Sequence, residues 1–80
     1  MTSEEFLDLV KSGQTVREAD LTGAILEKAI LNNGCLPGCD FSKARMMGAE
    51  LRGADLAGSR FQGADLRYSD LRGAKAAGVS

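Results

Sequence analysis

The sequence contains no histidine, and this absence limits the chemistry that it can carry. Histidine is the side chain that most often acts as general acid or base, and no nucleophile in this chain has such a partner. The only two cysteines, Cys35 and Cys39, cannot complete a zinc site without further cysteine or histidine ligands. We therefore expect a protein that is not an enzyme and that binds neither a metal nor a cofactor.

Long apolar runs are also missing. No stretch approaches the ~20 apolar residues that a membrane-spanning helix requires, so we expect no membrane insertion. The first residues include the acids Glu4, Glu5 and Asp8 and lack a long apolar segment, which is unlike a signal peptide. Eighty residues are enough for one domain. These features predict a small cytoplasmic protein.

A period of five residues dominates what is present. Residues 49–73 read AELRG, ADLAG, SRFQG, ADLRY and SDLRG, and the same phase runs from Ala19 to Gly78 without an insertion. It gives twelve blocks, which cover 60 of the 80 residues. The first position is always small, and the third is bulky and apolar in eleven of the twelve blocks. The third positions are Leu21, Leu26, Leu31, Leu36, Phe41, Met46, Leu51, Leu56, Phe61, Leu66, Leu71 and Ala76.

This period does not fit a helix, because at ~100° per residue successive leucines would scatter around the axis. It does fit a short strand followed by a corner. The first and third residues point to one side of a strand and the second points away, while glycine tolerates the positive φ of a corner. Repetition predicts a coil with an apolar inside and a polar outside. Cys39 then points inward and Cys35 outward, so they form no disulfide, as suits a reducing compartment.

The blocks resemble the pentapeptide repeat proteins, whose consensus is A(D/N)LXX. ADLTG, ADLAG and ADLRY match it outright, and AELRG, SDLRG and CDFSK match with conservative changes. The resemblance implies an all-β solenoid, a right-handed quadrilateral β-helix with four blocks per coil and therefore about three coils. Val16 lies five residues before Leu21 and starts a partial further coil. Residues 14–80 would form this β-helix.

Residues 1–13 break the period and predict one short capping α-helix over residues 3–12. Thr2 and Glu5 have the spacing of a capping box, and Phe6, Leu9 and Val10 recur at helical spacing. A helix of this length is not stable alone, so it must pack on the rest of the chain. The open edge of the first coil is the natural place, although a docking helix for a partner remains an alternative.

Several apolar side chains occupy outward positions that are polar, charged or glycine in most other blocks. They are Ile25, Ile30, Met47 and Tyr68. Clustered exposed apolar residues often mark an interface, and aromatic and methionine side chains are favoured there. We interpret these four as the binding surface for a protein partner of unknown identity. The alternative is that the N-terminal helix or its linker covers Ile25 and Ile30.

Acidic side chains at outward positions suggest a second interpretation. Some relatives that share this repeat mimic duplex DNA and bind DNA gyrase, and the resemblance extends that alternative to this chain. The acidic residues that would do so are Asp20, Asp40, Glu50, Asp55, Asp65 and Asp70. Residues 19–80, however, hold seven acidic and eight basic side chains, which is a poor copy of a polyanion. Direct nucleic-acid binding is also unlikely, because acids alternate with the arginines.

The C-terminal blocks carry no covering helix in this sequence. An open coil end presents unpaired backbone groups and apolar side chains, which favours pairing with another chain. In several relatives this end forms a coaxial homodimer, and the resemblance implies the same arrangement here. The contact would involve Phe61, Leu66, Leu71, Ala76 and Val79.

Overall fold

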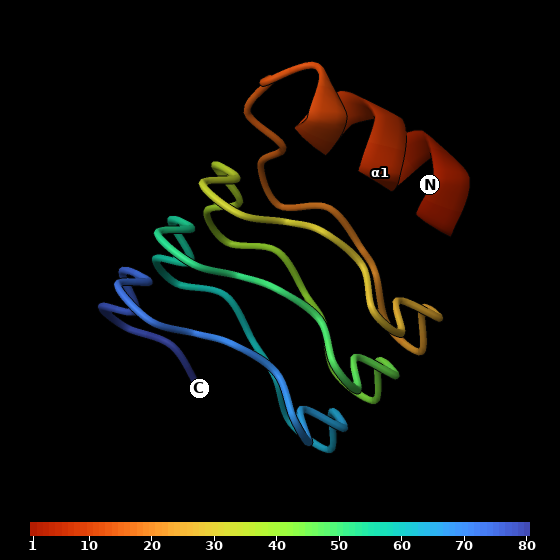
Figure 1. The fold of residues 1–80 in the computed structure, drawn as a ribbon, viewed down its shortest axis with the longest axis vertical. Coiled ribbons are helices and arrows are strands. Elements are labelled where there is room, and N and C mark those ends of the chain that lie inside the picture. The colour runs from red at the N-terminus through yellow and green to blue at the C-terminus, as the bar shows by residue number, and fades with distance from the viewer.

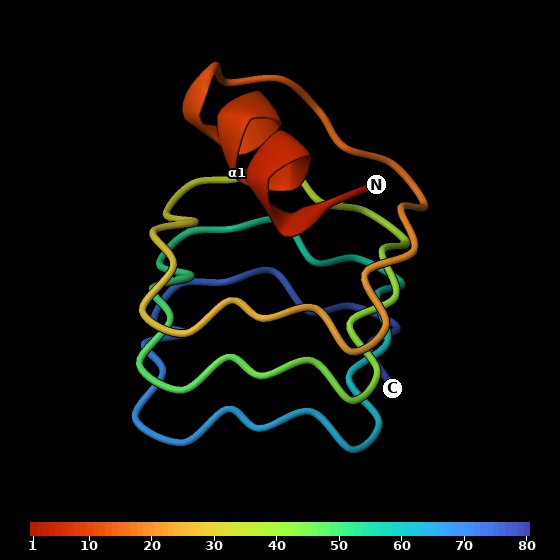
Figure 2. The same ribbon diagram turned by 90° about the vertical axis from the view of Figure 1, so that its right-hand side faces the viewer.

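The computed structural model describes residues 1–80 as one helix followed by a stack of coils (Figures 1 and 2). The helix, α1 (Ser3–Lys11), lies across the N-terminal end of the stack. The chain then winds through successive coils toward the opposite end, so that the C-terminus lies far from α1 (Figure 1).

The helix forms as its sequence predicts. The Thr2 hydroxyl accepts a hydrogen bond from the Glu5 backbone N–H, and the Glu5 carboxylate accepts one from the Thr2 N–H, which completes the capping box. The helix ends at Lys11, one residue before the predicted bound, and Gly13 takes a positive φ of 77° beyond it. Phe6 is the residue of α1 that is fully buried, and it fixes the helix on the coils.

Each coil contains twenty residues and has four sides. Backbone bridges join outward residues that are twenty apart, so each column stacks the same position of successive coils. The eight parallel bridges are Asp20–Asp40, Asp40–Arg60, Ile25–Arg45, Arg45–Asp65, Ile30–Glu50, Glu50–Asp70, Cys35–Asp55 and Asp55–Lys75. Four blocks per coil, the arrangement that the family resemblance implies, predict these four outward columns. Val16 is buried and its N–H donates to the Cys35 carbonyl, which confirms a partial coil before the first.

The expectation of a short strand on each side requires a correction. Every side holds a single bridged residue, and no run long enough to be a strand forms. The reason is the block length. Two of the five residues lie in a turn, which leaves one residue per block that is bridged to the neighbouring coils.

The corners are β-turns with a left-handed third residue. In the block of Leu26, for example, the Ala29 N–H donates to the Leu26 carbonyl, and Lys28 between them has a φ of 59°. A positive φ at that residue alone is the signature of a type II turn, where glycine is favoured. Pro37 is the second residue of its own turn. The fixed φ of proline matches the φ of that position, and the turn needs no N–H there.

The side chains of the block centres fill the tube. Those from Leu21 to Leu56 are almost completely buried, and Phe41 stacks on Phe61 with ring centroids 5.0 Å apart. Phe6 of α1 meets Phe41 edge-on at 5.9 Å, so the helix extends the same core. We estimate that each fully buried leucine contributes roughly 1.5–3 kcal/mol relative to exposure.

Inward polar residues bind carbonyl groups of a neighbouring coil. The Ser59 hydroxyl donates to the Leu36 carbonyl at 2.8 Å, and the Cys39 thiol donates to the Val16 carbonyl at 3.1 Å. Burial raises the pKa of the Cys39 thiol. Cys35 and Cys39 are both free, as the register predicts. These inward side chains therefore belong to the fold.

Candidate functional site

Two isoleucines are exposed near the N-terminal end of the coil stack. Ile25 is 62% exposed and Ile30 is 60% exposed, although every other residue in their two columns is charged. The helix and its linker leave both side chains open to solvent. The alternative in which these segments cover Ile25 and Ile30 is therefore wrong, because α1 buries Phe6 in the tube instead of lying on the outer walls.

Met47 and Tyr68 lie at the corner that joins the Ile25 side to the Ile30 side. Together with Glu27, Lys28 and Gly48 they line a shallow hollow of about 230 Å³. Tyr68 is 90% exposed and has a φ of 61°, at a position that most blocks give to glycine. Met47 is half-buried, and the Arg67 guanidinium contacts its sulfur at 3.2 Å. The four predicted apolar residues thus surround one corner of the prism.

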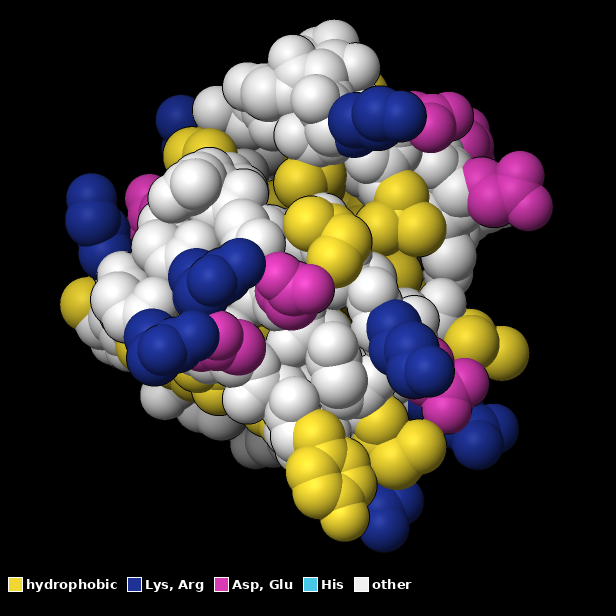
Figure 3. Space-filling view, in the orientation of Figure 1, with side chains coloured by type: hydrophobic (Ala, Val, Ile, Leu, Met, Phe, Trp, Pro, Cys, Tyr) yellow, Lys and Arg dark blue, Asp and Glu magenta, His cyan; other side chains and the backbone are white.

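A larger groove runs between α1 and the Ile30 side of the first coil. It has a volume of about 490 Å³ and is mainly apolar, with Lys11 as its charged member. Its lining residues are Leu7, Val10, Lys11, Ala29, Ile30 and Asn32. Figure 3 shows hydrophobic side chains gathered beneath α1 on this face of the molecule. Ile30 therefore forms one wall of a groove as well as part of an exposed patch.

Most of the acidic residues at outward positions stabilise the turns at the corners. Asp20, Asp40, Asp55, Asp65 and Asp70 each accept a hydrogen bond from the backbone N–H two residues later, at 3.0–3.2 Å. This Asx arrangement holds the start of the corner and satisfies one turn donor. It explains why aspartate recurs at the second position of the block. Glu50, which is one methylene longer, instead binds Asn32 and Arg52.

Most of these acids are also paired with arginine. Arg72 reaches Asp70 at 2.6 Å, Arg67 reaches Asp65 at 2.8 Å, and Arg60 reaches Asp40 at 3.2 Å. Arg52 bridges Glu50 at 3.0 Å and Asp70 at 3.7 Å. The side-chain hydrogen bonds from Arg72, followed by its backbone N–H, lower the pKa of Asp70 to about 2. The walls thus carry neutralised pairs instead of a continuous negative surface.

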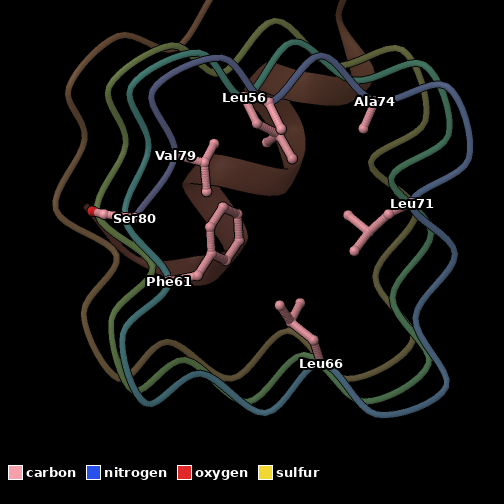
Figure 4. Close-up of a pocket in the computed structure, with 8 residues that line it drawn as sticks. Leu56, Phe61, Leu66, Leu71, Ala74, Val79 and Ser80 are labelled. Atoms are coloured by element: carbon pink, nitrogen blue, oxygen red, sulfur yellow. The ribbon is translucent and has the colours of Figure 1, made fainter.

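At the C-terminal end the tube is open. The side chains of Phe61, Leu66 and Leu71 point toward its centre from different sides, with Val79 beside them (Figure 4). They surround a hollow of about 320 Å³ whose lining is almost entirely apolar. Leu71 is 41% exposed, and Phe61, Leu66 and Val79 are half-buried. The predicted dimer residues, including Ala76, therefore lie around one rim.

The structure contains neither a cluster of metal-ligating side chains nor a membrane-spanning helix. No group of three or more histidine, cysteine, aspartate or glutamate side chains is placed to hold a metal ion. The structure also has no helix with the length and apolar character needed to span a bilayer.

Comparison with known families identifies the repeat. A family model described as pentapeptide repeats matches eight copies over residues 12–42 and 44–80. The chain belongs to the pentapeptide repeat family. Proteins of this family fold as right-handed quadrilateral β-helices, in agreement with the four-sided coils described above.

One solved structure shows the same fold. A pentapeptide repeat protein from the thylakoid lumen of Arabidopsis thaliana is 27% identical, with a TM-score of 0.79 over 91% of this chain and 50% of that chain. This pentapeptide repeat chain thus spans about half the length of that relative. Two cyanobacterial members also match. One from Cyanothece 51142 is 24% identical (TM-score 0.40, 84% of this chain, 56% of that chain). One from Nostoc Pcc 7120 is 28% identical (TM-score 0.37, 91% and 74%). No curated protein matches.

The groove beside α1 was not predicted from the repeats. Leu7, Val10 and Lys11 belong to a helix that the sequence placed over the first coil, but its position relative to the walls was not specified. The amphipathic spacing of α1 was the available signal. It showed which side of the helix is apolar, and part of that side remains exposed next to Ile30 because Phe6 alone enters the tube.

Proposed function

We propose that this pentapeptide repeat chain is a protein-interaction module that binds a partner along the corner between the Ile25 and Ile30 sides. The observation that carries the proposal is the exposure of the two isoleucines in columns that are otherwise charged. A rigid prism presents such side chains without losing much conformational freedom on binding. Tyr68 and Met47, on the same corner, extend the surface toward the C-terminal coil.

The test compares two double variants with the same change in charge. Ile25→Glu with Ile30→Glu places two carboxylates on the proposed surface. Ala57→Glu with Ala77→Glu places them at the diagonally opposite corner. We expect cross-linking in extracts of the native host to recover a defined partner with the wild-type chain and with the alanine variant, but not with the isoleucine variant. Equal recovery with both double variants would contradict the proposal.

DNA mimicry is less well supported by the geometry. Five aspartates bind turn N–H groups, and arginines pair with Asp40, Glu50, Asp65 and Asp70. A surface of neutralised pairs has little of the long-range negative potential by which a polyanion is recognised. We expect a supercoiling assay with DNA gyrase to be unchanged by a large excess of the protein. Inhibition that disappears in Asp65→Asn and Asp70→Asn variants would instead favour mimicry.

We also propose that a second copy of the chain covers the C-terminal rim, as the family resemblance implies. The support is the apolar hollow of about 320 Å³, in which Leu71 is 41% exposed. Light scattering over a range of concentrations should give twice the chain mass for the wild type. Leu71→Glu should give the mass of one chain, and Arg72→Glu, next to it on the outside, should not. A wild-type chain that stays monomeric throughout would contradict this proposal.

A further inference from the structure

The backbone of the first coil has unpaired groups on the Ile30 side. In the next coil, the Glu50 N–H donates to the Ala29 carbonyl, the Glu50 carbonyl accepts from Leu31, and the Arg52 carbonyl accepts from Asn33. The equivalent groups one coil earlier are the Ile30 N–H, the Ile30 carbonyl and the Asn32 carbonyl. None of these three has a backbone partner. They form a free edge that points toward the N-terminal end of the stack.

A neighbouring part of the same edge shows how such groups are paired. The linker after α1 runs over the Cys35 side, where the Val16 N–H donates to the Cys35 carbonyl and the Glu18 N–H donates to the Pro37 carbonyl. The distances are 2.9 and 3.0 Å, as in the regular coils. An extended segment therefore fits on this edge of the first coil. The linker covers the Cys35 side and leaves the Ile30 side without a partner.

The helix determines what can occupy the free edge. Because Phe6 is buried and contacts Phe41, α1 blocks the centre of the tube, so a complete coil of another molecule cannot stack there. Between α1 and the wall lies the groove of about 490 Å³, whose lining includes Ile30 and Asn32, the residues that carry the unpaired groups. A single extended chain fits this space, with its backbone on the edge and its side chains between Leu7, Val10 and Ala29.

We propose that the Ile30 edge binds an extended apolar segment of the partner protein as an added parallel strand. This inference rests on the proposed interaction function and names its chemistry, the addition of a strand to a free edge. The outward side chain of the segment stacks on Ile30, as Glu50 stacks below it. The inward side chains enter the apolar groove. Lys11, the charged residue of the groove, favours an acidic residue beside the apolar ones.

The ladder of the regular coils fixes the hydrogen bonds of the added strand. In each pair of stacked coils, the residue after the outward position donates its N–H to a carbonyl of the next coil, as Leu31 does to Glu50. The carbonyl of the residue before the outward position accepts from an N–H of that same coil, as Ala29 does from Glu50. The N–H of the outward residue itself points away from that coil. A segment with valine, isoleucine and valine in these three places therefore donates to the Ile30 carbonyl through its second valine. The isoleucine N–H makes no bond to the protein.

The experiment uses a capped, fluorescent heptapeptide of sequence SDVIVDS and the full chain. Fluorescence anisotropy measures binding of this peptide and of two forms methylated on one backbone nitrogen. Methylation of the second valine should weaken binding about tenfold or more, because it removes a buried hydrogen bond and introduces a clash. Methylation of the isoleucine should change binding by less than about threefold, since that N–H faces away from the edge.

Amide exchange in the full chain gives a second readout. The Ile30 N–H should exchange fast in the free protein and slower with SDVIVDS bound, whereas the Glu50 N–H, already paired, should not change. Equal binding of the two methylated peptides, or no binding of SDVIVDS at about 1 mM, would overturn strand addition. With strand addition overturned in this way, the Ile25→Glu, Ile30→Glu variant still tests the interaction function separately. Loss of the native partner from that variant would support the interaction function with a different mode of binding.

Discussion

The two ends of the coil stack have the same repeat but differ in how they are closed. At the N-terminal end, Phe6 of α1 is fully buried and contacts Phe41, and the block centres of the first coil are almost inaccessible. At the C-terminal end, Phe61 and Leu66 are half-buried and Leu71 is 41% exposed. The difference shows that burial in this fold depends on the neighbouring coil or cap, and not on the block alone.

Substitution of the two end phenylalanines should give the largest contrast. Phe6→Ala removes a fully buried ring that closes the tube, and we expect it to lower the free energy of unfolding by about 3–5 kcal/mol. In the background of Leu71→Glu, which leaves the rim open, Phe61→Ala removes a half-buried ring, and we expect about half of that loss. Urea unfolding followed by circular dichroism measures both substitutions in that background. Equal losses would contradict the dependence of burial on the neighbouring coil.

Two glycines in one corner column offer a finer comparison of inner and outer coils. An alanine Cβ at Gly53 would lie 2.5 Å from the Asn33 side-chain oxygen, whereas at Gly73 the nearest atom is 3.7 Å away. Both positions have positive φ, 66° and 71°. We expect both substitutions to lower the free energy of unfolding by about 1 kcal/mol, with a slightly larger decrease for Gly53→Ala, because the exposed Asn33 side chain must also rotate away.

Thermal unfolding of the two alanine variants provides the measurement. The larger decrease in midpoint temperature should belong to Gly53→Ala. A larger decrease for Gly73→Ala would contradict the view that the inner coils are the more tightly packed.

The sequence was sufficient for the part of the fold that repeats. The phase of the blocks predicted that Leu51 and Leu56 point inward, because burial in a solenoid follows directly from position in the block. The pairing of residues twenty apart was implied by the family resemblance. The sequence also predicted the capping box of α1, which depends on neighbouring residues. Local rules therefore determined both the coil and the cap.

The exceptions depend on how unlike elements meet. The groove beside Ile30 could not be predicted, because it follows from the angle at which α1 crosses the first coil, and Phe6 alone does not fix that angle. The strands were overestimated, since the period shows which residues face inward but not how many make ladder bonds. The block period also does not specify the turn geometry, and it therefore does not show that the aspartates accept hydrogen bonds from the turn N–H groups.

Glycine substitution of corner residues that have a positive φ should change the free energy of unfolding by a smaller amount, and this amount should differ between inner and outer coils. Lys43 in an inner coil and Tyr68 in the last coil have φ values of 60° and 61°, which glycine adopts without strain. We expect Lys43→Gly to raise the free energy of unfolding by about 1 kcal/mol at most. Tyr68→Gly should raise it less, because the outermost coil opens locally before the rest unfolds. Urea unfolding and amide exchange would test this order, which a greater gain for Tyr68→Gly would reverse.

The smallest effect should be the response to acid, and it should come from the aspartates. Hydrogen bonds from Ser42 lower the pKa of Asp40 in an inner coil, and Arg72 lowers that of Asp70 to about 2 in the last coil. A carboxylate with a lowered folded-state pKa stabilises the fold above its unfolded pKa of about 4, and this contribution is lost as pH falls through the folded value. Stability should therefore be constant above about pH 5 and decrease between about pH 4 and pH 2. Asp70→Asn, which keeps the turn acceptor but cannot ionise, should make this decrease shallower at the low end. An unchanged profile would show that the exposed Asp70–Arg72 pair is too strongly solvated to contribute.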